Sequence, residues 1–212
     1  MFKKYRFLIK LVFIIVFFLS CSKVPELDRG KIEEANKLNL FGAELMTRFG
    51  LYEESIPFLK RSSKMNPSDY EPLGNLGVAY MKLDKLDKSL LYFNKSVKLY
   101  RHNKEIYYYL GIIYFKKFEY KKSFENFEKV IAIYESNKKK YTYSSKGVKQ
   151  ESILITTSWF LAGIAADHIG KWEKAIKYSV KAMNEFQKVG DTKNFKAANN
   201  KVIELINKYR RK

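Results

Sequence analysis

Apolar residues recur at intervals of three and four along most of the chain after residue 28, which is the spacing of helices with one apolar face. The pattern is clearest over residues 70–100, where it breaks near Leu83 and Asp84 and then resumes. Two helices joined by so short a turn pack antiparallel. The sequence therefore predicts an all-α protein built from helical hairpins.

The hairpin pattern is repeated along the chain. Small and aromatic residues return every 34 residues, and a fourth copy lies 52 residues beyond the third, which is one period plus an insertion of 18 residues. One hairpin cannot bury its apolar face alone, whereas stacked hairpins share a continuous core. The equivalent positions are Ala43, Gly77, Gly111 and Gly163; Met46, Tyr80 and Tyr114; Ser55, Ser89, Ser123 and Ala175; and Leu59, Phe93 and Phe127.

This alternation of small and aromatic positions resembles the tetratricopeptide repeat over roughly residues 36–189. The turn residue Gly50, the closing Pro67 and the aromatic Trp159 fit the family pattern. We expect the departures to weaken single contacts without breaking the repeat. They are serine at the first three contacts between helices, Asp84 and Phe118 at the turn position, and Ser179 at an aromatic position.

The resemblance implies a right-handed α-solenoid of four tetratricopeptide hairpins with a concave inner surface, over residues 29–190. The expected segments are repeats at 36–69, 70–103, 104–137 and 156–189, an insertion at 138–155 and a capping helix at 191–212. The insertion is polar and basic, which predicts an exposed loop around residues 141–148.

Residues 1–20 read as a signal peptide, with a basic start and an apolar run over Leu11–Leu19. At about 1.5 Å per residue this run covers roughly half of a bilayer core, too little to span it. The only cysteine, Cys21, follows Ser20 directly. The junction resembles the lipobox of bacterial lipoproteins, in a loose form similar to spirochaetal sites, and implies a lipid on Cys21. An uncleaved signal anchor is the alternative.

Residues 21–28 are then a short tether that reaches less than about 30 Å, at about 3.5 Å per residue. It would hold the folded domain close to a membrane of the cell envelope, inner or outer, and outside the cytoplasm. The single cysteine also excludes an internal disulfide.

The charge is strongly basic, with 41 Lys and Arg against 22 Asp and Glu and a formal net charge of +19. Removal of the signal peptide leaves +15, and 34 of the basic residues are lysine. Because arginine dominates base and phosphate recognition, we expect no nucleic-acid partner. An anionic lipid surface or an acidic partner fits the charge, and a lysine-rich surface is also typical of an AT-rich genome.

Catalytic patterns do not occur in the sequence. His102 and His168 have no His or Cys neighbour at ligand spacing, and there is no phosphate loop or nucleophile elbow. We expect no enzyme, no metal site and no cofactor. An envelope-enzyme accessory, for example in peptidoglycan metabolism, would require Glu44, Asp167 and His168 to line one pocket.

The family resemblance places partner binding on the concave face formed by the first helix of each hairpin. That face would be apolar in the middle with a basic rim, which suits a helix or extended peptide carrying some acidic residues. Alternatively, the capping helix folds into the groove and fills it. The expected groove residues are Phe41, Glu44, Arg48, Asn75, Val78, Lys82, Tyr108, Tyr109, Ile112, Phe115, Lys116, Phe160, Ile164 and Asp167.

The sequence thus predicts a membrane-anchored scaffold that binds a protein or peptide in the cell envelope. By resemblance, its role would be in outer-membrane, secretion or pilus assembly. The alternatives are an accessory to an envelope enzyme and a basic surface that binds polyanions or anionic lipids.

Overall fold

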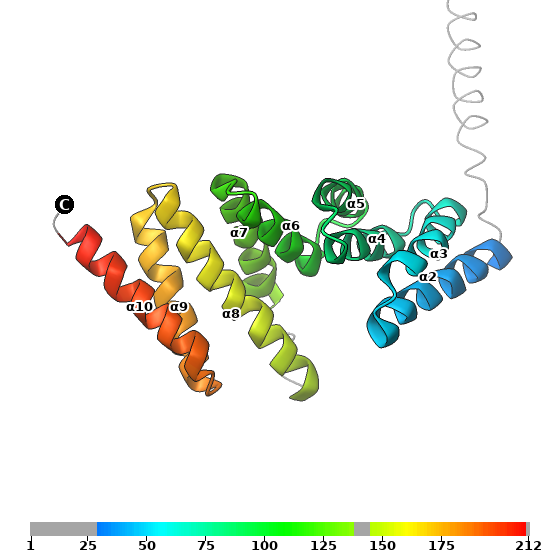
Figure 1. Cartoon of the computed structure of the whole chain (residues 1–212). Helices are drawn as coiled ribbons and strands as arrows, with labels where there is room; N and C mark the ends of the chain where they lie inside the picture. The colour runs from blue at the N-terminus through cyan, green and yellow to red at the C-terminus, as the bar shows by residue number, and fades with distance from the viewer. Residues whose placement is uncertain (1–28, 138–144, 211–212) are drawn as a thin grey trace, which may run out of the picture.

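The computed structural model describes residues 29–137 and 145–210, and every regular element in this part of the chain is an α-helix (Figure 1). The predicted all-α class is confirmed. None of the described helices is long and apolar enough to cross a membrane. The helices are α2 (Arg29–Phe49), α3 (Tyr52–Met65), α4 (Glu71–Lys82), α5 (Leu86–Leu99), α6 (Lys104–Lys116), α7 (Tyr120–Asn137), α8 (Ser145–His168), α9 (Trp172–Lys188) and α10 (Thr192–Tyr209).

Successive helix pairs stack side by side along the described part of the molecule (Figure 1). Within the pairs, α2 packs on α3, α4 on α5, α6 on α7 and α8 on α9, and α10 packs on α9 at the C-terminal end. The second helix of each pair also contacts the first helix of the next pair, most weakly between α5 and α6. The predicted signal peptide, Cys21 and the tether lie outside the described residues.

Glycine permits the close approach of the two helices in the central hairpins. A Cβ atom added to Gly77 would lie 2.3 Å from the ring of Phe93. One added to Gly111 would lie 2.7 Å from the ring of Phe127. Real Cβ atoms do not approach other atoms this closely, so the large ring on one helix requires the glycine on the other.

The first hairpin differs from this arrangement by one position. Ala43 is the expected contact residue, but the structure buries Gly42, where an added Cβ would lie 2.8 Å from Leu59, and leaves Ala43 half-buried. The loop between α2 and α3 contains two residues, one fewer than the loop between α4 and α5. The extra residue lies in α2 instead, because the left-handed turn residue Gly50 follows Gly42 by eight positions, whereas Asp84 follows Gly77 by seven.

Serine forms hydrogen bonds across the central hairpins at positions where the family pattern has alanine. The hydroxyl of Ser89 donates to the carbonyl of Gly77 at 2.7 Å, and that of Ser123 donates to the carbonyl of Gly111 at 2.9 Å. Both serines are fully buried. Their polar groups are therefore satisfied, which explains how the fold accommodates this departure.

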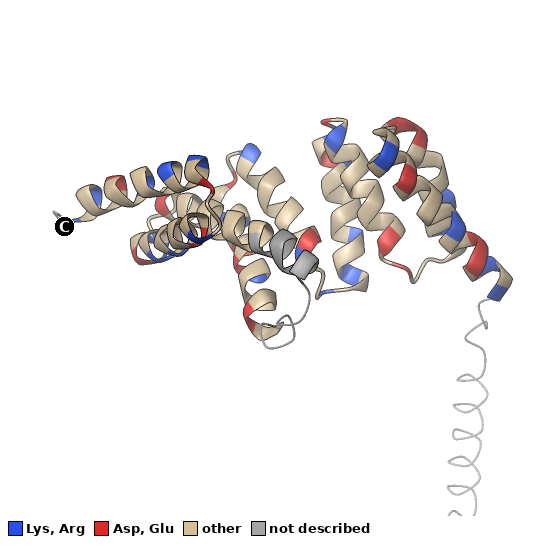
Figure 2. Ribbon diagram, turned by 90° about the horizontal axis from the view of Figure 1, so that it is seen from below, with Lys and Arg blue, Asp and Glu red and all other residues tan. Residues whose placement is uncertain are grey.

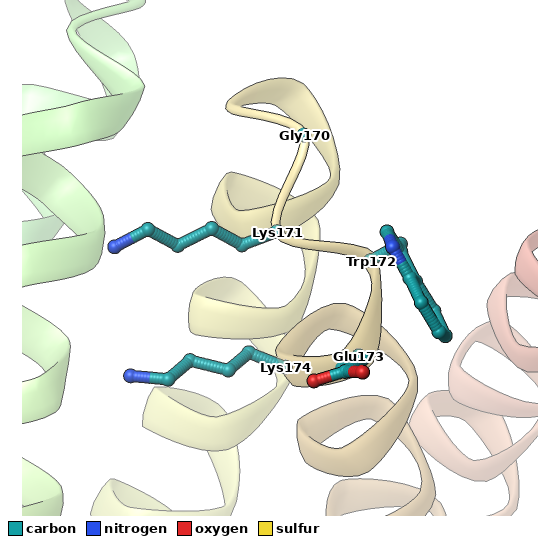
Figure 3. Close-up of a pocket in the computed structure, with 5 residues that line it drawn as sticks. All are labelled: Gly170, Lys171, Trp172, Glu173 and Lys174. Carbon is teal, nitrogen blue, oxygen red and sulfur yellow. The ribbon is translucent and has the colours of Figure 1, made fainter.

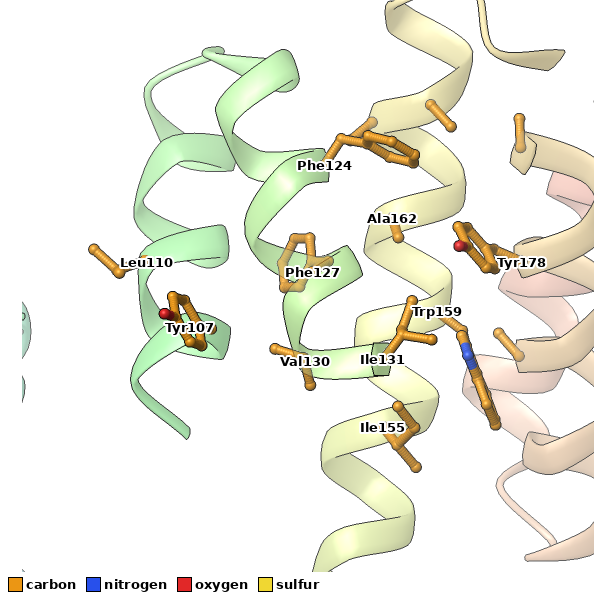
Figure 4. Packing of buried hydrophobic residues seen from close by; sticks show 14 of the residues in the cluster. Tyr107, Leu110, Phe124, Phe127, Val130, Ile131, Ile155, Trp159, Ala162 and Tyr178 are labelled. Carbon is orange, nitrogen blue, oxygen red and sulfur yellow. The ribbon is translucent and has the colours of Figure 1, made fainter. Parts of the chain in front are cut away.

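The larger hydrophobic core lies between α6, α7, α8 and α9 (Figure 4). Phe124, Phe127 and Val130 of α7 are fully buried there, and they pack with the buried residues Trp159 and Ala162 of α8. A smaller core connects the first two hairpins. It consists of Met46, Leu59, Leu76, Ala79 and Tyr80.

A residue with left-handed backbone geometry stands in the turn of each hairpin. Gly50 and Gly170 have φ of 68° and 74°, as expected of glycine. Asp84 and Phe118 adopt the same geometry with φ of 55° and 58°. The turn conformation is thus retained where the glycine is not.

Helix α8 is longer than the sequence indicated. It begins at Ser145, so residues 145–148 of the predicted loop are helical, while residues 138–144 lie outside the described part of the chain. At the other end, the predicted capping helix is α10. The carboxylate of Asp191 accepts a hydrogen bond from the backbone N–H of Asn194 at 3.0 Å and starts that helix.

Candidate partner-binding groove

The junction between the second and third hairpins is the most loosely packed of the three hairpin junctions. α2 lies against α4 and α6 lies against α8, whereas α4 and α6 pack less closely and meet where Ile106 reaches Gly74. Two cavities open at this junction, with volumes of about 280 and 440 Å³. Both are lined by Tyr70, Asn103 and Glu105. We name the 280 Å³ cavity, which lies between α4 and α6, the inner cavity.

The walls of the inner cavity come from one face of each of two helices. α4 contributes Glu71, Asn75 and Val78, which are four and three residues apart, and α6 contributes Glu105 and Tyr109, four residues apart. The wall is therefore acidic at the starts of the helices and apolar one to two turns further on.

Local contacts fix the residues that lead into α4 and α6. The side chain of Asn103 accepts a hydrogen bond from the backbone N–H of Ile106 at 3.1 Å and caps α6. The rings of Tyr70 and Tyr100 stack with their centroids 4.7 Å apart. The hydroxyl of Ser96 donates to the carbonyl of Tyr70 at 2.9 Å. These contacts fix the tyrosine pair that lines the larger cavity.

Negative charge surrounds the tyrosines. Burial, and then the negative charge of Glu71, raise the pKa of Tyr70 above its usual value. Asp69 and Glu105 act in the same direction. Burial, followed by Glu105, also raises the pKa of Tyr109. Both phenols are therefore neutral hydrogen-bond donors at physiological pH.

Three expected groove residues line this cavity, namely Asn75, Val78 and Tyr109. The amide of Asn75 donates to the side-chain oxygen of Asn39 at 2.9 Å, and the amide of Asn39 donates to Glu71 at 3.3 Å. This chain of hydrogen bonds ties α4 to α2 and orients two of the polar groups at the cavity. Tyr109 stacks on the ring of Phe93 at 5.5 Å.

The expected groove residues of the first hairpin lie apart from the inner cavity on α2. Phe41 is 47% exposed and packs edge-on against Phe58 with a centroid distance of 4.8 Å. Glu44 and Arg48 form an ion pair with each other on the same helix. Their charges are thus mutually compensated.

The expected residues of the third and fourth hairpins form a half-buried apolar surface. Burial raises the pKa of Tyr108, while a hydrogen bond to Thr157 of α8 opposes this effect. That bond joins the inner faces of α6 and α8. Lys82 and Lys116 are exposed at the ends of α4 and α6. The half-buried apolar residues are Ile112, Phe115, Phe160 and Ile164.

Asp167 differs from the expectation for a groove residue, because α10 covers it. Only 8% of the residue is exposed. Its carboxylate accepts hydrogen bonds from Lys201 at 2.9 Å, Lys208 at 2.7 Å and the hydroxyl of Tyr209 at 2.8 Å. Its acceptor sites are occupied by the protein's own C-terminal helix, so the end of the groove at α8 is closed by α10.

Sequence reasoning missed Tyr70, Tyr100 and Glu71, and it did not count Glu105 among the groove residues. They lie at the boundaries between repeats, where hydrophobic periodicity carries no information. One signal was available, because Glu71 and Glu105 are 34 residues apart and so occupy the same position in consecutive repeats. Equivalent carboxylates in the first turn of adjacent first helices lie on the same side of a solenoid.

A smaller cavity of about 210 Å³ lies at the turn between α8 and α9, where Lys171 and Lys174 point toward α7 and Trp172 points toward α10 (Figure 3). Lys174 pairs with Glu128 at 2.6 Å. Both lysine ammonium groups lie over the ring of Phe124, at 4.6 and 5.3 Å from its centre. These side chains join neighbouring hairpins, and we assign this cavity to packing.

The residues required for an enzyme-like pocket are not brought together. Glu44 pairs with Arg48 on α2. His168 stacks on Tyr120 with a centroid distance of 3.8 Å. Within the described residues, no group of three or more His, Cys, Asp or Glu side chains is placed to hold a metal ion.

Comparison with known proteins supports the repeat assignment. Residues 70–103 and 104–137 each match the tetratricopeptide repeat family model. Similar solved structures include a MamA structure at 23% identity and TM-score 0.58, covering 74% of this chain and 81% of that chain. They also include MamA from residue 41 to the end, from Desulfovibrio magneticus RS-1, at 21% identity and TM-score 0.58. This match covers 84% of this chain and 97% of that chain.

A third similar structure is pilF of Pseudomonas aeruginosa, at 14% identity and TM-score 0.58, covering 86% of this chain and 72% of that chain. No curated protein matches the sequence. At these identities the structural likeness shows the fold. The second and third hairpins are therefore tetratricopeptide repeats within an all-α helical-repeat fold.

Proposed function

We propose that the protein is a scaffold that binds a segment of a partner protein in the groove between α4 and α6. The observation that carries this proposal is the inner cavity, where two loosely packed first helices present apolar and polar side chains together. Ligand sites combine apolar walls with a few convergent polar groups in this way. Helical-repeat folds commonly use such inner surfaces for peptides.

Site-specific photo-crosslinking in cells tests the groove. A photoreactive residue placed at Asn75 should give a protein adduct, whereas the same residue at Leu91, which is 51% exposed on α5, should not. Adding Tyr109→Ala to the position-75 variant should remove the adduct while the helical circular dichroism is retained. Equal adducts from both positions, or an adduct that is insensitive to Tyr109→Ala, would show that the groove is not the binding surface.

We further propose that the chain is a lipoprotein of the cell envelope, held at a membrane through Cys21. The support is the sequence of residues 1–21, with its basic start, short apolar run and serine–cysteine junction. The first described helix begins at Arg29, only eight residues after Cys21. The pairing of a lipid anchor with tandem repeats suggests an assembly role in outer-membrane, secretion or pilus machinery.

Replacement of Cys21 tests the anchor. Cys21→Ala should move the protein from the detergent phase to the aqueous phase. The acyl chains on Cys21 would anchor the wild type stably, and the variant would carry none of them. The matched control is Ser22→Ala, which should leave partitioning unchanged. Retention of Cys21→Ala in the membrane fraction would favour the uncleaved signal anchor.

A further inference from the structure

The groove between α4 and α6 has the opposite charge to the molecule as a whole. The chain carries a formal net charge of +19, and lysine and arginine are spread over the helices (Figure 2). The charged side chains that line the two cavities are Glu71, Glu105 and Lys104. Asp69 lies close enough to Tyr70 to raise its pKa. Carboxylates therefore outnumber cations at this site.

The one cation among these lining residues offsets only part of their negative charge, because Glu71 and Glu105 are two carboxylates against the single Lys104. Lys104 is 7% exposed, and its ammonium nitrogen lies 3.9 Å from the nearer oxygen of Glu105, beyond hydrogen-bond distance. The side chain of Glu105 is 54% exposed. Glu71 receives a hydrogen bond from the neutral amide of Asn39 at 3.3 Å. Each carboxylate keeps acceptor capacity for a charged donor.

The site also presents aromatic surface. Tyr70 and Tyr100 stack on each other and line the larger cavity, and Tyr109 lines the inner cavity beside Val78. The face of a tyrosine ring attracts a cation. A cavity that combines tyrosine rings, carboxylates and an apolar end fits a long side chain with an apolar stem and a cationic head.

We propose that the two cavities take an arginine side chain of the bound partner segment, with apolar residues of the same segment beside Val78 and Tyr109. This inference rests on the proposed function, since it names the chemistry of the groove's partner. A guanidinium group suits the site better than an ammonium group, because it is planar, stacks on tyrosine and offers five donors to carboxylate oxygens. This arginine-bearing partner differs from the acidic partner that the lysine-rich sequence suggested.

Selection from a phage-displayed library of random 12-residue peptides on the full chain in detergent tests the proposal. Peptides whose binding is lost with Tyr109→Ala should carry arginine at one position, flanked by apolar residues. The double variant Glu71→Gln, Glu105→Gln should bind them about tenfold or more weakly, because a charge-assisted bond becomes a neutral one. The control Glu54→Gln, an exposed carboxylate on α3, should bind them as the wild type does.

The contrary outcomes separate the two proposals. Tyr109-dependent peptides without a fixed basic residue, or with Asp or Glu there, would overturn the arginine site and leave the groove as a binding surface. Failure to select any Tyr109-dependent peptide would overturn both. If the double variant does not fold by circular dichroism, Glu105→Gln alone carries the test, and unchanged binding by that variant would overturn the arginine site.

Discussion

Two fully buried serines in this fold have different hydrogen-bonding environments. Ser89 lies at a contact between α4 and α5, where its hydroxyl donates to the carbonyl of Gly77 at 2.7 Å. Ser179 takes the position occupied by Phe93 and Phe127 in the earlier hairpins, and its hydroxyl has no hydrogen-bond partner among the described residues. The same chemical group is thus satisfied at one site and unsatisfied at the other.

Alanine substitution should therefore have opposite effects at the two positions. Ser89→Ala should lower the free energy of unfolding by about 1 kcal/mol, because a hydrogen bond is lost and the Gly77 carbonyl loses its side-chain donor. Ser179→Ala should raise it by about 1 kcal/mol, because an unsatisfied buried hydroxyl is removed. Urea denaturation monitored by circular dichroism measures the free energy of unfolding of both variants. A change of the same sign in both variants would contradict this account.

At the residue scale, the sequence identified the apolar part of the groove better than its polar part. Val78 and Tyr109 follow from the inner positions that the family resemblance implies for the first helix of each hairpin. Glu71 and Glu105 stand in the first turns of their helices, where a carboxylate is common for reasons of helix capping and dipole alone. Their role at the cavity depends on the separation of α4 and α6, and local sequence does not encode that separation.

At the scale of elements, the hairpin turns show how strongly the repeat geometry constrains single residues. Phe118 adopts φ of 58° between α6 and α7 and is 76% exposed. Left-handed geometry is unfavourable for a residue with a Cβ atom, and most of all for a bulky one. The packing of two long helices on either side evidently outweighs this local strain.

Glycine should relieve that strain. Phe118→Gly should raise the free energy of unfolding by about 1 kcal/mol, since the left-handed conformation costs other residues about 1–2 kcal/mol and glycine offsets part of the gain through its greater freedom when unfolded. Phe118→Ala is the matched control and should stay within about 0.5 kcal/mol of the wild type, because it keeps the Cβ atom. Thermal melts of the three proteins would contradict the strain argument if the alanine variant were stabilised as much as the glycine variant.

Helix α8 shows what periodicity could not predict about the elements. Residues 145–148 contain only one large apolar residue, Val148, and give no amphipathic signal, so they were assigned to a loop, yet α8 includes them. Extending a helix adds about one hydrogen bond per residue once the helix exists, without the cost of a new nucleus. A helix anchored by Trp159 and Ala162 in the core can therefore continue through such a segment.

At the scale of the molecule, ion pairs accompany the stacking of hairpins. Lys85 pairs with Glu53 at 3.1 Å across the first junction, and Lys117 pairs with Asp87 at 2.8 Å across the second. Exposed pairs of this kind contribute little to stability, because water screens the charges and ordering the long side chains costs entropy. They use part of the basic surplus that the composition shows, and the packing of the hairpins provides most of the stability.

The C-terminal end of the stack is held by a buried carboxylate. Asp167 of α8 lies under α10, where Lys201, Lys208 and Tyr209 donate to it. Burial tends to raise the pKa of Asp167, but the hydrogen bonds from Lys208, Lys201 and Tyr209 outweigh burial and lower the pKa from 3.8 to about 2. The ionised form is thus the one that fastens α10 to α8.

Acidification should weaken the attachment of α10 to α8 over a defined pH range. Because the folded-state pKa is depressed, the stabilisation is fully present above about pH 4 and is lost as the pH falls through about 2. Asp167→Asn should therefore lower the free energy of unfolding at pH 7 by about 2 kcal/mol, which corresponds to the pKa shift. The difference between variant and wild type should shrink between pH 4 and pH 2, since the protonated wild type also lacks the charge. Urea denaturation at pH 7, 4 and 2 measures this, and a difference independent of pH would show that α10 is held by packing alone.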